Sequence, residues 1–341
     1  MDSPTSHDVA KQAGVSVATV SRVLNDAPHV SPAVRRQVLR AIRKLNYQPN
    51  RTAQRLRAKQ SKVLGLIISD IQNPFFTAVV RGIEDVAHQA GYSLVLCNSD
   101  EDPDKEKLYI NVMRAEAVAG VILASASEAK PHASDLLAQN IPVVAIDRQI
   151  KSRRIDSVLA ANEQGACDAV THLINLGHTC IGYVGLPLTR TPGIERLKGY
   201  ERALREHKLP VVRARIRIAN AKQLGGHDSA LDLLVQQPCI TALFVANNLM
   251  TLGALNAIRE RGLEIPRDIS VVGFDDVPWA TLLQPPLTTI AQPTYELGQK
   301  AAARLLERLK NPEQPVVHTH LGTTLIVRGS TSAPRGKENS A

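Results

Sequence analysis

The chain has 341 residues, of which 44% are hydrophobic and 21% are charged. It is therefore long enough for more than one packed core and too apolar to be disordered throughout. It has no apolar run of about eighteen residues and no signal-peptide pattern at its start, so we expect a cytoplasmic protein without a membrane span. The four cysteines, Cys97, Cys167, Cys180 and Cys239, have no C-x-x-C spacing. This spacing argues against a zinc site or a disulfide framework, so all four are predicted to be buried structural thiols.

The net charge of +9 is concentrated near the N-terminus. Residues 1–60 contain eleven Lys and Arg but only three Asp, a net charge of +8, which leaves +1 for the rest of the chain. Such a local excess is typical of a nucleic-acid-binding module. A solvated basic surface without a binding role has the same composition, so charge alone leaves both interpretations open.

The basic segment begins with the spacing of a helix-turn-helix. Thr5 and Asp8 can form a capping box for a first helix, and Gly14 supplies the left-handed residue that ends it. Ser16 can then cap a second helix over residues 17–25. Two short helices joined by a glycine turn predict a helix-turn-helix.

A third helix is predicted to begin after Ser31, with Pro32 at its first position. Its inward positions recur at helical spacing, and they are Val34, Val38, Ile42 and Leu45. Its arginines, which we expect to face solvent, are Arg35, Arg36, Arg40 and Arg43. Three small helices around one apolar core suffice to present the second helix to a DNA major groove.

The segment HDVAKQAGVSVATVSRVLNDAPHVSPAVRRQVLRAIRKLNYQPNRTAQRLR resembles the headpiece of the lactose/galactose repressor family, above all in DVA-x-x-AGVS, TVSRVLN and LNY-x-PN. The resemblance extends to about residue 330. It implies that Val17, Ala18 and Arg22 contact base edges of a palindromic operator DNA. The residues that it implies at or near phosphates are Thr5, Ser16, Thr19, Ser21, Asn25 and Tyr47. The chemistry agrees, because an arginine can donate two hydrogen bonds to a guanine and small apolar side chains suit a thymine methyl. The alternative is that Val17 and Ala18 merely fill the helix.

Residues 47–60 are polar and basic and connect the headpiece to the rest of the chain. Pro49 ends the third helix, and the next residues can form a helix too short to be stable alone. The resemblance implies that this hinge orders on operator DNA through Asn50, Ala53 and Leu56. It also implies that Leu56 wedges into a base step of the minor groove. A flexible linker is the alternative, although it does not explain an exposed leucine among basic residues.

From residue 63 the pattern changes to apolar runs that alternate with helical stretches. The runs of the first lobe cover 63–69, 92–98, 120–124 and 142–147, with helices expected near Pro74, Pro103 and Lys130. The same alternation restarts with runs at 180–185, 215–218, 241–246 and 269–275. Alternating strands and helices predict parallel sheets, here in two doubly wound lobes with a cleft at the carboxyl ends of the strands. The expected fold is thus an all-α helix-turn-helix headpiece with an α/β, two-lobed, periplasmic-binding-protein-like effector domain.

Polar and aromatic residues follow these strands, where a small ligand would bind. Guanidinium, carboxylate and amide groups beside aromatic rings suit a polyhydroxylated ligand. The predicted effector-binding residues are Asn73, Phe75, Phe76, Asp147, Arg148, Arg190, Arg196, Asn247, Asp275 and Gln292. Nine of them, all except Arg190, also match motif positions of pentose-binding periplasmic proteins. Several can instead serve as helix caps or salt bridges between the lobes.

The ligand itself is predicted from charge. Three arginines face two aspartates in this set, which favours a sugar acid over a neutral sugar. Arg190 and Arg196 also match the purine-responsive branch of the family. That branch, however, has a threonine and a stacking aromatic residue where this chain has Pro192 and Ala221, which disfavours a purine.

Other function classes find no support in the motifs. The chain lacks a nucleotide-binding glycine motif and a nucleophile elbow, so no catalysis or cofactor is expected. His318 and His320 lack a third ligand and are not predicted to bind metal. A sugar-modifying enzyme or a transport-type sugar-binding protein would have no use for the basic headpiece. The predicted domains are a DNA-binding domain at 1–46, a hinge at 47–60, an effector and dimerisation domain at 61–330 and a disordered tail at 331–341. Without leucine heptads in the tail, we expect a homodimer.

Overall fold

A computed structural model describes residues 4–24, 28–47, 61–128 and 132–335. The chain forms two compact units, residues 1–61 and residues 62–341. Among the predicted DNA-binding residues, Asn25, Asn50, Ala53 and Leu56 lie outside the described ranges.

The N-terminal unit is all-α, with α1 (Ser6–Gln12), α2 (Val17–Leu24) and α3 (Pro32–Lys44). The predicted capping box is present, because Thr5 N donates to Asp8 Oδ2 at 2.8 Å and Asp8 N donates to Thr5 Oγ1 at 3.3 Å. Gly14 follows with a φ of 61°, which lets the chain turn into α2. The predicted helix-turn-helix is therefore confirmed.

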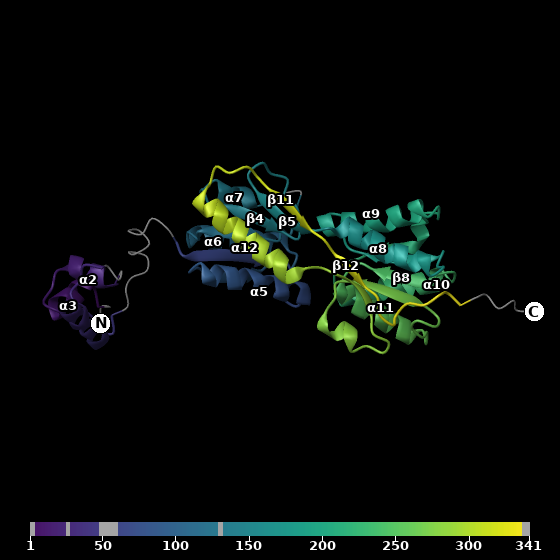
Figure 1. Ribbon diagram of the computed structural model, residues 1–341, viewed down its shortest axis with the longest axis horizontal. Helices are drawn as coiled ribbons and strands as arrows, with labels where there is room; N and C mark the ends of the chain where they lie inside the picture. The colour runs from purple at the N-terminus through teal and green to yellow at the C-terminus, as the bar shows by residue number, and fades with distance from the viewer. Residues whose placement is uncertain (1–3, 25–27, 48–60, 129–131, 336–341) are drawn as a thin grey trace, which may run out of the picture. The chain divides into compact units, whose positions relative to one another are not determined.

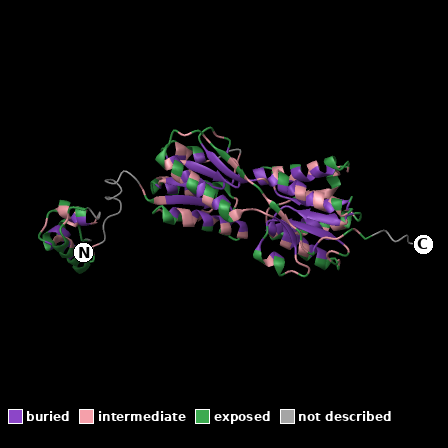
Figure 2. Ribbon diagram, in the orientation of Figure 1, coloured by how far each residue is buried: buried purple, intermediate pink, exposed green. Residues whose placement is uncertain are grey.

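One small apolar core holds the three helices together. Its fully or nearly buried members are Val9, Ala10, Ala13, Val20, Val23, Val38 and Ala41. The predicted inward positions Val34, Ile42 and Leu45 are half-buried against this core. Figure 2 shows the buried residues in the interior of the unit and exposed ones on its outer surface.

The second unit has two lobes, each built on a six-stranded sheet. The first sheet has the order β11-β5-β4-β3-β1-β2. Its strands are β1 (Val63–Ile68), β2 (Ser93–Asn98), β3 (Gly120–Leu123), β4 (Val143–Ile146), β5 (Asp156–Ala160) and β11 (His318–Leu321). Its helices are α5 (Pro74–Gln89), α6 (Pro103–Ala115), α7 (Ala133–Leu137) and α12 (Thr294–Lys310). All pairings in this sheet are parallel.

The second sheet repeats this order as β12-β10-β9-β8-β6-β7. Its strands are β6 (Ile181–Gly185), β7 (Ile216–Ile218), β8 (Ala242–Val245), β9 (Ser270–Phe274), β10 (Thr288–Ala291) and β12 (Thr324–Ile326). Its helices are α8 (Asn162–Asn175), α9 (Thr191–Glu206), α10 (Gln223–Gln236) and α11 (Asn248–Glu260), with short 3-10 turns at Arg213–Arg215 and Pro278–Thr281. Only β12 runs antiparallel, against β10. The two-lobed α/β prediction is confirmed.

The chain passes between the lobes three times, after β5, after β10 and after β11. Because α12 and β11 return to the first sheet late in the sequence, each lobe is built from distant segments. In Figure 1, α12 lies alongside α5 on the first lobe. A Cβ atom at Gly82 or Gly298 would collide with the backbone of the facing helix, so these two glycines allow the close approach of α5 and α12.

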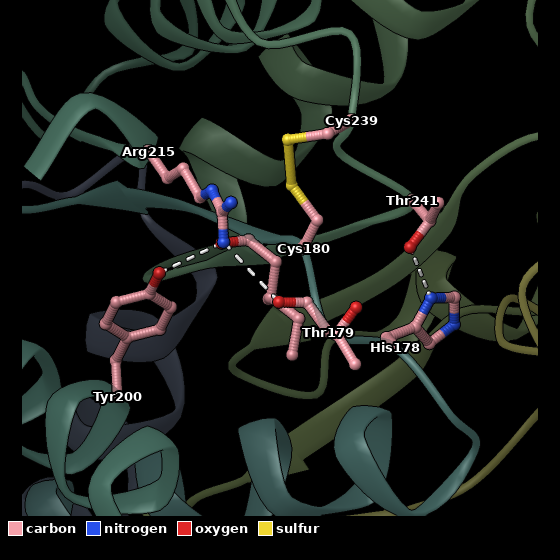
Figure 3. The surroundings of a disulfide bond; sticks show 8 residues. His178, Thr179, Cys180, Tyr200, Arg215, Cys239 and Thr241 are labelled. Carbon is pink, nitrogen blue, oxygen red and sulfur yellow. Dashed lines mark hydrogen bonds between the residues drawn. A yellow bond between two sulfur atoms is a disulfide. The ribbon is translucent and has the colours of Figure 1, made fainter. Parts of the chain in front are cut away.

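Two sequence predictions about the second unit are wrong. Cys180 and Cys239 form a disulfide, with their Cα atoms 5.9 Å apart, whereas Cys97 and Cys167 are free. Cys180 immediately precedes β6, and Cys239 lies three positions before β8. Because β6 and β8 pair side by side, the sheet brings together cysteines 59 positions apart. Figure 3 shows this bridge near His178 and Thr241, whose side chains are hydrogen-bonded at 2.8 Å.

The second wrong prediction concerns the start of the disordered tail. Residues 331–335 are described by the structure, and Thr331 and Ser332 are hydrogen-bonded to the second lobe. Ser332 N donates to Ser270 Oγ at 3.0 Å, and Ser332 O lies 2.9 Å from His178 Nε2. Thr331 Oγ1 also lies 3.0 Å from His172 Nε2. These polar contacts hold a segment whose composition alone indicates disorder.

Candidate functional site

The exposed face of α2 carries the residues predicted to read bases. Ala18 and Arg22 are exposed, whereas Val17 is half-buried and partly packed against the headpiece core. Arg22 lies in the last turn of α2 and Val17 in the first. The helix therefore presents one long cationic side chain and small apolar ones on its surface.

The predicted phosphate-contacting residues surround this helix. Thr5 and Ser16 are exposed and stand at the starts of α1 and α2, where Thr19 N donates to Ser16 Oγ at 3.1 Å. Thr19 and Ser21 are half-buried on α2. Tyr47 is half-buried after α3 and packs against the headpiece core. The exposed hydroxyl groups of Thr5 and Ser16 can donate hydrogen bonds to a phosphate backbone.

In the second unit, one cavity is lined by residues of both lobes. All ten residues predicted from the strand ends line it. Asn73 and Asn247 are the N-caps of α5 and α11, where their side chains accept from Phe75 N and Met250 N. The two amides therefore have a structural role as caps and also face the cavity. Pro192 and Ala221 line it too, so no aromatic side chain stands at either position.

Two aspartates face this cavity from equivalent positions in the lobes. Asp147 follows β4 with a φ of 65°, and Asp275 follows β9 with a φ of 78°. The backbone N–H of Asp147 donates to Val158 O, and that of Asp275 donates to Ile290 O. A left-handed conformation is costly for a residue other than glycine and persists where the surroundings enforce it, often at binding sites. The repeated fold thus aims two carboxylates at one space.

Arg196 is fixed in place by the protein itself. Its Nε donates to Asn162 Oδ1 at 2.9 Å, and its Nη1 donates to Ala246 O at 2.6 Å. Its guanidinium also lies 3.7 Å from the centre of the Phe274 ring, within the range of a cation–π interaction. Arg196 is only 3% exposed, so it is a pre-oriented donor rather than a flexible one.

Glu101 also lines the cavity and was missed by the sequence analysis. Its carboxylate accepts from Arg148 Nη1 and Nη2 at 2.8 and 2.6 Å and lies 3.0 Å from Arg190 Nη1. Burial opposes its ionisation, but Arg148 and Arg190 outweigh that effect and lower the pKa of Glu101. Its position in the sequence could have revealed it. Like the other predicted residues, Glu101 follows the carboxyl end of a strand, here β2.

Glu101 corrects the charge balance on which the sugar-acid prediction rested. Three guanidinium groups now face three carboxylates, those of Glu101, Asp147 and Asp275. The positive excess counted from the sequence is therefore absent. Charge no longer favours an acidic ligand over a neutral one.

Polar contacts also join the two lobes around the cavity. Lys222 Nζ, on the second lobe, lies 2.7 Å from Asp70 and 2.9 Å from Asp100 of the first. Asn248 Nδ2 donates to Asn73 Oδ1 at 2.8 Å, and the Arg190–Glu101 ion pair also crosses the cleft. The two lobes are therefore held together by direct polar contacts around the cavity.

Neither a membrane nor a metal is indicated by the described residues. Within these ranges, no helix has the length and apolar character needed to cross a bilayer. The same ranges contain no cluster of three or more His, Cys, Asp or Glu side chains placed to hold a metal ion.

Comparison with known proteins gives the same division of the chain. Residues 5–50 match the family described as bacterial regulatory proteins, lacI family, and residues 170–331 match the periplasmic binding protein-like domain. The helix-turn-helix and the two-lobed domain define a DNA-binding transcriptional repressor, not an enzyme. The chain belongs to the LacI family.

Relatives of this chain include repressors with different names. It is 37% identical over 337 residues to the ribose operon repressor of Halalkalibacterium halodurans, covering 98% of this chain and 99% of that protein. It is 34% identical to the HTH-type transcriptional repressor PurR of Mannheimia succiniciproducens, covering 96% and 98%. A lac repressor dimer bound to operator and the anti-inducer ONPF superposes with a TM-score of 0.84 at 33% identity, covering 97% of this chain and 100% of that one.

Proposed function

We propose that this protein represses genes of carbohydrate utilisation and that a sugar-type effector in the cavity between the lobes controls its binding to DNA. The observation that carries the proposal is the lining of the cavity, where guanidinium, carboxylate and amide groups converge beside Phe75 and Phe76. Hydroxyl groups donate and accept hydrogen bonds to such a set, and the C–H faces of a sugar pack on aromatic rings.

On the DNA side, the protein acts as a cytoplasmic homodimer on a palindromic operator. Arg22, Val17 and Ala18 read base edges in the major groove, and the hydroxyl-bearing residues around α2 contact phosphates. The hinge residues Asn50, Ala53 and Leu56 contact the minor groove between the half-sites. The basic excess of residues 1–60 supports this role because neutralising phosphates supplies much of the affinity for DNA.

Coupling between the two activities follows from the contacts between the lobes. An effector that binds one arrangement of the lobes more tightly than another shifts the population of DNA-binding dimers by its differential affinity. Effector and operator then change each other's affinity by the same factor.

A purine is the second candidate, because the chain resembles repressors named PurR. Phe75 and Phe76 are the aromatic side chains of the cavity, and their rings pack edge to face at 4.9 Å. Ala221, on the second lobe, offers no aromatic surface to sandwich a base. The cavity therefore favours a sugar-type ligand over a purine.

The test is a thermal-shift screen of the purified chain against sugars, sugar acids, sugar phosphates and purines. A ligand at one hundred times its Kd should stabilise the protein by about 2.7 kcal/mol. Each hit is then added to a binding assay with operator DNA, and it should change operator affinity. Stabilisation by purines alone would refute the sugar-type effector, and a hit without effect on DNA binding would refute the coupling.

A further inference from the structure

Glu101 binds the guanidinium groups of Arg148 and Arg190, which an anionic ligand would need as hydrogen-bond donors. Arg148 directs Nη1 to Glu101 Oε2 and to Ser125 O, both at 2.8 Å, and Nη2 to Glu101 Oε1 at 2.6 Å. This is the two-pronged geometry in which an arginine binds a carboxylate most strongly. Arg190 completes the arrangement from the other lobe, with Nη1 at 3.0 Å from Glu101 Oε2.

Burial of Glu101 and Arg148 strengthens their ion pair. Its side chain is 17% exposed, and that of Arg148 is 6% exposed, so solvent competes weakly for either group. The two arginines hold the pKa of Glu101 below its ordinary value even though burial raises it, so the carboxylate stays ionised at neutral pH. A ligand carboxylate would have to displace an ionised group that is already bound.

An acidic ligand would also meet the other carboxylates. Asp147 and Asp275 line the same cavity as Glu101. Of the three guanidiniums, Arg148 is bound to Glu101, and Arg196 already donates to Asn162 and Ala246 O. Like charges in a buried space repel more strongly than in water. A hydroxyl group, which donates as well as accepts, meets no such repulsion.

We propose that Glu101 is the internal counter-ion of the cavity and that it selects an uncharged polyhydroxylated effector against the corresponding acid. The selection of an uncharged sugar rests on the proposed function, because that function supplies the class of ligand. The counter-ion role of Glu101 stands on the contacts of Arg148 and Arg190 alone. Specificity then arises in part from a group that repels the wrong ligand.

The first experiment needs no knowledge of the effector. Glu101→Ala leaves a space between Arg148 and Arg190 that a small carboxylate can enter. The thermal midpoint of this variant should fall below that of the wild type in chloride. It should rise in a saturable way with added acetate or formate at constant ionic strength, whereas the wild type should not respond. If acetate stabilises the variant no more than the wild type, the counter-ion role is refuted.

The second experiment tests selection with a variant that keeps the side-chain size. Glu101→Gln and wild type are titrated with neutral sugars and their acids in pairs, such as ribose with ribonate and galactose with galacturonate. The wild type should bind the neutral member of a pair, and Glu101→Gln should shift the ratio of affinities toward the acid by about tenfold or more, the value of one charged hydrogen bond.

Glu163→Gln is the matched control, because Glu163 pairs with Arg202 outside the cavity at 2.9 Å. It should leave the preference unchanged. Preference of the wild type for the acid, or an unchanged ratio in Glu101→Gln, would refute the selection. If no sugar or acid binds the wild type, the proposed function fails, whereas the acetate experiment still decides the role of Glu101.

Discussion

Asp147 should make the ligand-free protein less stable as the pH rises. Burial raises its pKa from 3.8 to about 6, and Glu101 and Asp275 add to this effect, while Arg148 and Arg196 oppose it. Between pH 3.8 and about pH 6, the Asp147 carboxyl group is therefore protonated in the folded state but ionised in the unfolded state. The contribution of Asp147 to stability is highest below pH 3.8 and falls as the pH rises through about 6, the reverse of a carboxyl group whose pKa is lowered on folding.

The size of this effect follows from the two pKa values. A difference of about 2 units corresponds to about 3 kcal/mol of lost stability above pH 6. Asp147→Asn removes the buried charge and keeps the side-chain shape, and asparagine tolerates the left-handed φ of 65°. The variant should therefore be more stable than the wild type at pH 8, and its advantage should grow by about 1 kcal/mol between pH 5 and pH 8.

Urea unfolding followed by circular dichroism at pH 5, 6, 7 and 8 measures this gap. Asp276→Asn is the control, because burial raises the pKa of Asp276 but Arg328 and Thr289 outweigh that effect and lower it. Its loss should destabilise the protein by an amount that stays nearly constant from pH 5 to pH 8, because Asp276 is ionised in both the folded and the unfolded state over this range. A gap between Asp147→Asn and wild type that stays constant with pH would contradict the reasoning, as would a variant that is less stable at pH 8.

Four further predictions address the disulfide, the DNA and the effector. Cys239→Ser, or reduction of the wild type, should lower the free energy of unfolding by about 4 kcal/mol, since the bridge closes a loop of 59 residues; equal midpoints with and without reductant would contradict this. Arg22→Ala should lose about 1 to 3 kcal/mol of discrimination at a guanine in a competition assay, and an equal loss on random DNA would show a phosphate contact instead. Leu56→Ala should reduce operator bending in a phasing assay and leave effector affinity unchanged; undiminished bending would refute the wedge. Arg196→Ala should weaken effector binding at least about tenfold by calorimetry while operator affinity without effector stays nearly intact, and wild-type affinity would remove Arg196 from the effector site.

Local sequence patterns were sufficient for much of the fold. The capping pair of Thr5 and Asp8, the turn at Gly14 and the prolines that begin α5 and α6 act on neighbouring residues, so their effects can be read without the rest of the chain. The apolar runs located eight of the strands. They missed β5, β10, β11 and β12. The segment of β5 begins with Asp156, a buried carboxylate that pairs with Arg308 from α12.

The sequence also indicated which residues line the cavity, because parallel strands bring their carboxyl ends to one edge of a sheet. Tertiary structure decided how those residues are paired. The Glu101 carboxylate forms an ion pair with Arg190, 89 positions away, and Cys180 meets Cys239 because β6 and β8 are neighbours in the sheet. His178 holds Ser332 in the same way. Such contacts depend on which strands become neighbours and on how closely the two lobes approach each other. Both are set by the packing of the whole domain, so no local sequence pattern reveals them.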